Sequence, residues 1–279
     1  MRFSFIFSSF LALTSILTSL QSFSQTQENT KPLAIGQILT IDSKILEEER
    51  ILNIYLPENY ENSDKKYPVI YLLDGSIDQD FLHIAGLVQF NSLSWINVIP
   101  ECIVVGIANV DRKRDFSHPT SIKRDKKDFP SSGGSQKFIS FIENELKERI
   151  ESQYRANNES YLIGQSLGGL LATEILLNKT ELFDHYIIVS PSLWWDNGSV
   201  LKTSLTHHSP KSISIAVGKE GEILENNAKE LYMKLVDDGY PKGNLYFKYL
   251  ENRNHGDALH MAVYNIFEHL SETNKKKNQ

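Results

Sequence analysis

Short apolar runs rich in β-branched residues alternate with amphipathic segments along the chain, and this alternation constrains the fold more than any other feature. Most runs are continuous, which is typical of strands buried on both faces of a sheet. They occupy residues 67–75, 102–107, 160–164, 185–190, 212–218 and 245–250, after a half-exposed candidate at 50–57. Apolar residues at helical spacing occupy residues 135–152, 225–239 and 258–270. This order predicts an α/β fold, with a mostly parallel central sheet and helices on both faces.

The residues just after each strand matter most for function, because reactive groups in such a sheet gather at the carboxyl ends of the strands. Residues 160–173, SYLIGQSLGGLLAT, place a serine between glycines at such a junction. They contain G-x-S-x-G, a strand–turn–helix elbow whose flanking glycines avoid a Cβ clash around a strained serine. We expect Ser166 to be a nucleophile and the Leu167 amide, at the start of a helix, to bind an oxyanion. A tight turn with a structural serine is the alternative.

A nucleophilic serine needs a base, and the chain contains eight histidines. His255 lies in LENRNHGD, after the last predicted strand and before the last predicted helix. The chain order nucleophile, acid, histidine requires a base at this position. His260 is the near rival, but it falls on the predicted helix. We therefore expect His255 to be the base.

The acid that orients the base should follow the predicted strand at 212–218. The next segment, KEGEILE, contains three glutamates. Glu220 is nearest to the strand end, and we expect it to complete a Ser-His-Glu triad. Glu222 is the second choice, and the remaining alternatives are Glu225, Asp184, Asp196 and Asp257.

A second oxyanion donor is expected from the loop after the predicted strand YPVIYLLDG. The backbone amides of Gly75 and Ser76 are the candidates, because an oxyanion hole can be built without side chains. Asp74 is expected to shape the turn rather than to react. The amides of Gly75 and Ser76 should therefore lie close to Ser166.

Two further groups follow strand ends and so approach the same edge of the sheet. Arg112, Arg114 and Asp115 lie in NVDRKRDFSHP. They either bind a carboxylate or phenolate of the substrate or form an Arg–Asp pair that pins the loop, and the second interpretation is favoured. Trp194 and Trp195 either stack on an aromatic acyl group or fill the core.

Charge and motif content indicate a small-molecule partner. The net charge of −6 and the pI near 5.8 argue against nucleic acid, because phosphate binding needs a basic face. His255, Asp257 and His260 read H-x-D-x-x-H, but this spacing does not place both histidines on one helical face, and we expect no metal. Without a phosphate-binding glycine loop, we expect no cofactor. The single cysteine, Cys102, is expected to be a small core residue.

The N-terminal sequence MRFSFIFSSFLALTSILTSLQSFSQ has the layout of a secretory signal peptide. We expect a signal peptide at 1–24 cleaved near Ser24, a linker at 25–36, a hydrolase domain at 37–271 and a disordered charged tail at 272–279. We therefore expect a secreted or periplasmic protein that has no stable membrane association after cleavage. An uncleaved anchor helix is the alternative. The sequence leaves the oligomeric state open.

The chain resembles the Putative esterase family of the α/β-hydrolase fold, which includes siderophore esterases, feruloyl esterases, S-formylglutathione hydrolase and mycolyltransferases. The resemblance covers most of residues 36–270. It rests on the Ser166 elbow and on RILNIYLPENY, KKYPVIYLLDG, IVVGIANVDRKRDFSHP, VSPSLWWD and NRNHG. One departure is Gln165, where related sequences often carry histidine.

This resemblance implies a serine ester hydrolase with Ser166, an acid after Gly218, and His255 as its triad. It implies a small-molecule ester as the partner, such as a siderophore lactone or an aromatic or short-chain acyl ester. An acyltransferase with the same triad, or a non-catalytic binding protein on the same scaffold, stays open at this point.

Overall fold

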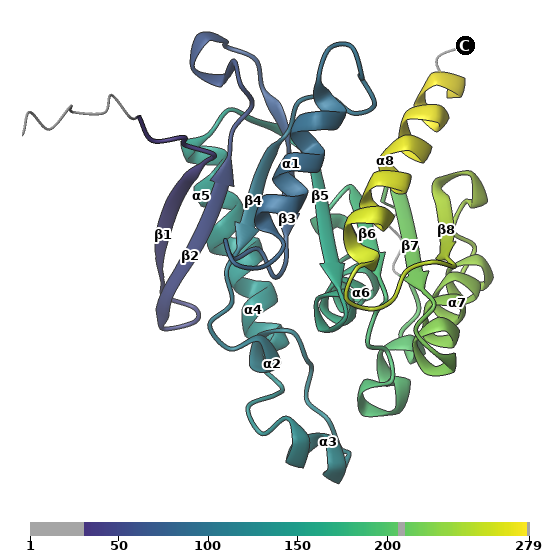
Figure 1. The fold of residues 1–279 in the computed structure, drawn as a ribbon. Coiled ribbons are helices and arrows are strands. Elements are labelled where there is room, and N and C mark those ends of the chain that lie inside the picture. Colours follow the sequence, from purple (N-terminus) through teal and green to yellow (C-terminus); the bar gives the residue numbers. More distant parts are fainter. Residues whose placement is uncertain (1–30, 206–209, 278–279) are drawn as a thin grey trace, which may run out of the picture. The chain divides into compact units, whose positions relative to one another are not determined.

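The computed structural model describes residues 31–205 and 210–277, and at its centre is an eight-stranded sheet in the order β1-β2-β4-β3-β5-β6-β7-β8 (Figure 1). The strands are β1 (Gln37–Ser43), β2 (Glu48–Tyr55), β3 (Tyr67–Leu72), β4 (Ile103–Ile107), β5 (Ala156–Gln165), β6 (His185–Val189), β7 (Ser212–Gly218) and β8 (Leu245–Leu250). β2 is antiparallel to both β1 and β4, and all other neighbours are parallel. The predicted α/β-hydrolase architecture is therefore confirmed, with an antiparallel edge whose first strand the sequence patterns did not indicate.

Helices cover both faces of the sheet, and α1 and α8 lie side by side on one of them (Figure 1). The helices are α1 (Phe81–Ser92), α2 (Arg112–Asp115), α3 (Lys123–Asp128), α4 (Ser135–Phe141), α5 (Lys147–Gln153), α6 (Leu167–Asn178), α7 (Glu222–Asp237) and α8 (Ala258–Lys277). A π-helical turn joins α4 to α5, so the predicted helix at 135–152 is continuous but not uniform.

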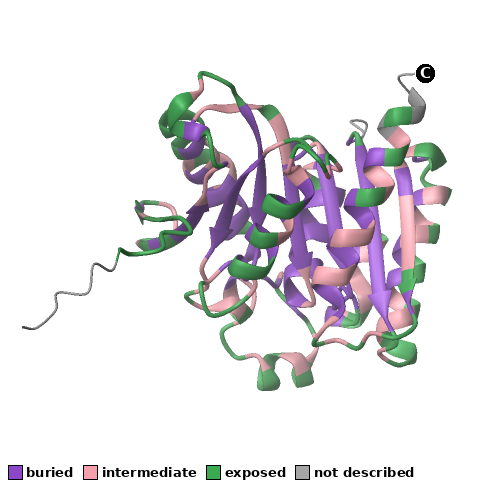
Figure 2. Cartoon of the chain, turned by 45° about the horizontal axis from the view of Figure 1, so that its top comes forward, coloured by how far each residue is buried: buried purple, intermediate pink, exposed green. Residues whose placement is uncertain are grey.

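The core is divided between the two faces of the sheet by the two-residue period of the strands. On β5, Tyr161 and Ile163 pack into the cluster beneath α1 and α8, whereas Leu162 faces the cluster beneath α4, α6 and α7. The central strands are buried and the outer surfaces of the helices are exposed (Figure 2). The carboxyl ends of the strands are thereby supported by the packed core.

Contacts divide the chain into Met1–Ala34 and Ile35–Gln279. The expected signal peptide at 1–24 lies outside the described residues. The expected disordered tail is wrong for residues 272–277, because α8 continues to Lys277. Leu270 still packs on the core, and each further residue of a formed helix adds a backbone hydrogen bond. None of the described helices is both long and apolar enough to cross a membrane.

Candidate active site

Ser166 lies in a strained turn between β5 and α6, with φ 58° and ψ −118°. This conformation is costly for a residue with a Cβ and persists only where the surrounding structure enforces it. The chain passes so close here that a Cβ on Gly164 would lie 2.4 Å from the carbonyl oxygen of Gly168. Glycine at position 164 is therefore a steric requirement of the turn, whereas a Cβ on Gly168 would come no closer than 3.3 Å to Asp74.

Backbone hydrogen bonds hold this turn from two sides. The Ser166 amide donates to the Val189 carbonyl at 3.1 Å, and the Ser166 carbonyl accepts from the amides of Leu170 and Ser192 at 2.9 and 3.0 Å. Leu167 is the first residue of α6, where backbone amides lack intrahelical acceptors and carry the positive end of the helix dipole. This end of α6 is thus suited to stabilise negative charge beside Ser166.

His255 and Glu220 lie at the same edge of the sheet and contact one another. His255 Nδ1 lies 2.5 Å from Glu220 Oε2. Glu220 Oε1 accepts hydrogen bonds from Ser190 Oγ at 2.5 Å and from the Gly218 amide at 2.8 Å. The Glu220 side chain is 1% exposed and that of His255 is 44% exposed, so the carboxylate is fixed while the imidazole remains accessible.

The environment of Glu220 favours its ionised form. Burial alone would raise the pKa of this carboxyl group, but hydrogen bonds from His255, Ser190 and the Gly218 amide outweigh that effect and lower the pKa. A carboxylate in contact with Nδ1 holds the imidazole so that its other nitrogen can accept a proton.

Ser166 and His255 line one open cavity of about 370 Å³, together with Gln165 and Gly256. Within the described part of the chain, Ser166 Oγ is hydrogen-bonded to Ser192 Oγ at 3.3 Å and makes no hydrogen bond with the His255 ring. A rotation about the serine side chain redirects the hydroxyl group, and catalytic hydrogen bonds often form only when substrate is bound.

Gly75 and Ser76 differ in the availability of their amides. The Gly75 amide donates to the Ile107 carbonyl at 3.0 Å, so it is not free to bind an oxyanion. A Cβ on Gly75 would lie 2.3 Å from the Cα of Gly106, which explains why glycine is required here. Of the two predicted oxyanion donors, the Ser76 amide therefore remains the candidate.

Arg112 forms a bidentate ion pair with Asp74. Its Nε and Nη2 lie 2.6 and 2.8 Å from the two carboxylate oxygens, and Asn109 donates to the same carboxylate at 2.6 Å. Asp74 has a φ of 55° and is 6% exposed. This geometry agrees with the expected roles of turn-shaping for Asp74 and loop-pinning for Arg112, although both residues line the cavity beside Ser166.

Arg114 and Asp115 belong to a different network, away from this cavity. Arg114 pairs with Asp115 at 2.7 Å and with Glu48 at 2.5 Å, and the fully buried Arg50 pairs with Asp115 at 2.7 Å. These two residues therefore have a structural role.

Three neighbours of the site were given no role by the sequence: Gln165, noted only as a departure from related sequences, and Ser190 and Ser192, which were missed. The Gln165 side-chain amide donates to the backbone carbonyl of His255 at 2.6 Å, which ties the elbow to the histidine loop. Ser190 and Ser192 both follow the end of β6, so the strand-end rule could have identified them. Their hydroxyl groups contact Glu220 and Ser166, respectively.

Asp80 is a fourth residue that the sequence did not indicate. It precedes α1 and lines the cavity with Asp74 and Arg112. Burial, reinforced by the negative charge of Asp74, raises the pKa of Asp80 to about 6. Its position before a helix was the only available signal, and such acids are common as helix caps.

The two tryptophans have different environments. Trp195 is fully buried, and its indole N–H donates to the His118 carbonyl at 2.8 Å, so it fills the core. Trp194 is 37% exposed and lies against Phe129, with ring centroids 6.1 Å apart. Of the two, Trp194 is thus the one whose ring remains accessible, although it is not part of the lining of the cavity beside Ser166.

The rival site residues have other contacts. Glu225 accepts from the amides of Glu220 and Gly221, both at 3.0 Å, whereas Glu222 is exposed at the start of α7. His260 stacks on His83 with centroids 5.1 Å apart. The other acids are engaged elsewhere: Asp184 with Lys211, Asp196 with Thr120 and Ser121, and Asp257 with Arg253. Among the described residues, no group of three or more potential ligands gathers around a metal site.

Comparisons with known proteins agree with this architecture. The family model described as Putative esterase matches residues 43–256. The chain is 35% identical to the ferri-bacillibactin esterase BesA of Bacillus subtilis over 193 residues, which are 61% of this chain and 67% of BesA. An IroE-like serine hydrolase from Shewanella oneidensis is 32% identical, with a TM-score of 0.72 over 85% of this chain and 80% of that one. The BES protein from Bacillus cereus is 26% identical, with a TM-score of 0.74 over 88% and 98% of the respective chains. The chain therefore belongs to the Putative esterase family and is an ester hydrolase of the α/β-hydrolase fold.

Proposed function

We propose that the chain is a serine carboxylic-ester hydrolase whose triad is Ser166, His255 and Glu220. The contact of 2.5 Å between His255 Nδ1 and Glu220 Oε2, at the sheet edge that bears the strained Ser166, carries this proposal. A buried carboxylate paired with an accessible imidazole is the arrangement that general-base catalysis on a serine needs.

The geometry supports the following reaction. The Ser166 hydroxyl turns from Ser192 to His255, which takes its proton as Oγ attacks the ester carbonyl. Glu220 stabilises the imidazolium that forms, and the amides of Leu167 and Ser76 hold the oxyanion. His255 then protonates the leaving alcohol, and an acyl-enzyme remains. Water activated by His255 hydrolyses this intermediate and restores Ser166.

We further propose an aromatic siderophore ester as the substrate. The relative at 35% identity is named for a siderophore, ferri-bacillibactin. The cavity of about 370 Å³ is open, which suits one arm of a bulky molecule. Trp194 lies outside the lining of this cavity, two residues after Ser192, and its exposed face can stack on an aromatic acyl group that extends beyond the cavity.

A substrate panel tests this proposal: a catecholate trilactone, feruloyl esters and short-chain nitrophenyl esters, each with wild type and Ser166→Ala. We expect wild type to prefer the trilactone and Ser166→Ala to lose activity on every ester. Activity that survives Ser166→Ala would remove the proposed nucleophile. Added glycerol separates hydrolysis from acyl transfer, and a predominance of glyceryl ester over free acid would refute the hydrolase assignment.

A serine-reactive phosphonate identifies the nucleophile independently of substrate. Peptide mass mapping should locate the adduct on Ser166, and Ser192→Ala should retain it. Ser192 is the control because its hydroxyl lies 3.3 Å from that of Ser166. An adduct on Ser192, or no adduct on folded protein, would contradict the proposal and would favour a binding protein.

The export of the chain is also a proposal, based on the N-terminal sequence. We propose that residues 1–24 are removed near Ser24 during secretion to the periplasm or the medium. Intact mass measurement on the exported protein should give an N-terminus near Gln25. Full-length protein retained in the membrane fraction would instead indicate an anchor helix.

A further inference from the structure

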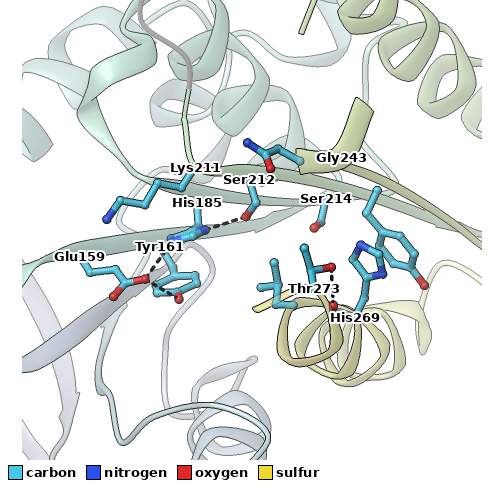
Figure 3. Close-up of a pocket in the computed structure, with 12 residues that line it drawn as sticks. Glu159, Tyr161, His185, Lys211, Ser212, Ser214, Gly243, His269 and Thr273 are labelled. Atoms are coloured by element: carbon cyan, nitrogen blue, oxygen red, sulfur yellow. Dashed lines mark hydrogen bonds and ion pairs between the residues drawn. The ribbon is translucent and has the colours of Figure 1, made fainter. Parts of the chain in front are cut away.

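A second cavity, of about 250 Å³, lies at the amino ends of the strands, the opposite sheet edge from Ser166. It is formed near the beginnings of β5, β6, β7 and β8 and is closed by the C-terminal half of α8 (Figure 3). Because the catalytic residues follow the carboxyl ends of these strands, this cavity is separate from the proposed active site.

Flat rings form the walls of this amino-end cavity. Tyr161 and His185 stack with centroids 4.2 Å apart and planes at 13°, and Tyr246 and His269 stack at 3.9 Å and 12°. The Ser214 side chain lies between the Tyr161–His185 pair and the α8 side of the cavity (Figure 3). The space is therefore bounded by aromatic surfaces with a hydroxyl group between them.

Several polar groups of the lining are already engaged. His185 Nδ1 lies 2.6 Å from Ser212 Oγ, and His185 Nε2 lies 3.0 Å from Glu159 Oε1. The Thr273 hydroxyl donates to the His269 carbonyl at 2.9 Å, and Lys211 pairs with an aspartate outside the cavity. A ligand thus meets few polar groups that still need a partner.

Ser214 is the exception. This residue is 1% exposed, and its Oγ makes no hydrogen bond with any residue that the structure describes. Among the buried side-chain polar atoms of the lining, it alone lacks a partner in that part of the chain. An unpaired buried hydroxyl is destabilising, so the position favours a partner supplied from outside.

We propose that the amino-end cavity binds a small neutral phenol, with its ring between the aromatic walls and its hydroxyl group hydrogen-bonded to Ser214 Oγ. The cavity offers one unpaired hydroxyl group and flat aromatic walls, which match a ligand with one hydroxyl group on an aromatic ring. A sugar would need many more polar partners. Glu159 and Lys211 carry opposite charges on the lining, which favours no net charge on the ligand. A cavity of about 150 Å³ already admits benzene, so about 250 Å³ is sufficient.

The test uses fluorine NMR of 4-fluorophenol with the full chain, and fluorobenzene as the probe without a hydroxyl group. We expect saturable binding of 4-fluorophenol and weaker binding of fluorobenzene. Ser214→Ala should weaken 4-fluorophenol by about 2- to 10-fold, the value of one net hydrogen bond, and leave fluorobenzene unchanged. Ser271→Ala, a buried serine of α8 outside the lining, is the matched control and should change neither.

A second variant keeps the proposal testable if Ser214→Ala fails to fold. Thr273→Phe places a ring in the cavity from a partly exposed helical position and should weaken both probes at least tenfold. Unchanged binding in both variants would place the phenol elsewhere and overturn the proposal. Absence of binding by wild type, or displacement of 4-fluorophenol by glycerol at equal concentration, would also overturn it.

Discussion

Replacing Glu220 with glutamine tests the reasoning about the triad most directly, because the change nearly conserves size but removes the charge and exchanges one acceptor oxygen for an NH₂ donor. Glu220 Oε1 accepts from the Gly218 amide at 2.8 Å and from Ser190 Oγ at 2.5 Å, while Oε2 faces His255 Nδ1 at 2.5 Å. The Gly218 amide can only donate, so it favours the orientation of the glutamine that keeps its oxygen at the Oε1 position. The NH₂ group then faces His255.

This orientation imposes the wrong tautomer on the base. An NH₂ donor requires His255 Nδ1 to accept, so the ring proton moves to Nε2, the nitrogen that should receive the Ser166 proton. The opposite orientation leaves the Gly218 amide facing a second donor, at a cost of ~1–3 kcal/mol. That cost alone lowers the active population by about 5- to 150-fold.

The lost negative charge beside the imidazolium adds to this effect. In a Ser-His-Asp triad the corresponding amide substitution lowers kcat by about 10⁴. We therefore expect Glu220→Gln to lower kcat by about 10³- to 10⁴-fold, which corresponds to ~4–5.5 kcal/mol in activation free energy.

Steady-state kinetics with a short-chain nitrophenyl ester provide the measurement. Glu222→Gln is the matched control, since Glu222 is exposed at the start of α7, and its kcat should stay within about twofold of wild type. Thermal unfolding should show that both variants are folded. A Glu220→Gln enzyme that keeps more than about a tenth of the wild-type kcat would refute the reasoning.

Four further predictions concern other contacts. Gln165→Leu removes the hydrogen bond to the loop of His255, the proposed base, and should lower kcat by roughly tenfold on every ester; an unchanged kcat would show that packing alone holds the loop. Trp194→Ala should raise KM for aryl esters and leave acetyl esters unaffected, and equal effects on both would exclude stacking. Asp115→Asn leaves the fully buried Arg50 with weaker compensation and should lower the free energy of unfolding in urea by about 3 kcal/mol; a loss below about 1 kcal/mol would contradict this. Burial alone would raise the pKa of Asp196, but hydrogen bonds from a neighbouring loop lower this pKa from 3.8 to about 2. The ionised Asp196 therefore stabilises the folded protein above pH 3.8, and this stabilisation is lost as the pH falls toward 2. Asp196→Asn should flatten the dependence of stability on pH in this window, and an unchanged slope would be evidence against it.

The sequence patterns predicted most of the strands and helices because these elements depend on local properties of the chain. Continuous apolar runs identified the parallel strands to within a few residues, and the steric demands of the elbow located Ser166. The chain order alone directed attention to His255 and to the loop that contains Glu220. β1 was missed because it lies at the sheet edge, where its exposed residues lack the pattern of a buried strand.

Other properties were decided only by the tertiary structure, because they depend on contacts between segments far apart in the sequence. The approach of β4 engages the Gly75 amide, and the end of β6 brings Ser190 and Ser192 to Glu220 and Ser166. No local pattern contains such partners, since a hydrogen bond is fixed by distance and direction in space. The sequence by itself therefore determined the scaffold and the reactive residue types. Packing decided which donors remain free, how the base is held, and where the unpaired hydroxyl group of Ser214 lies.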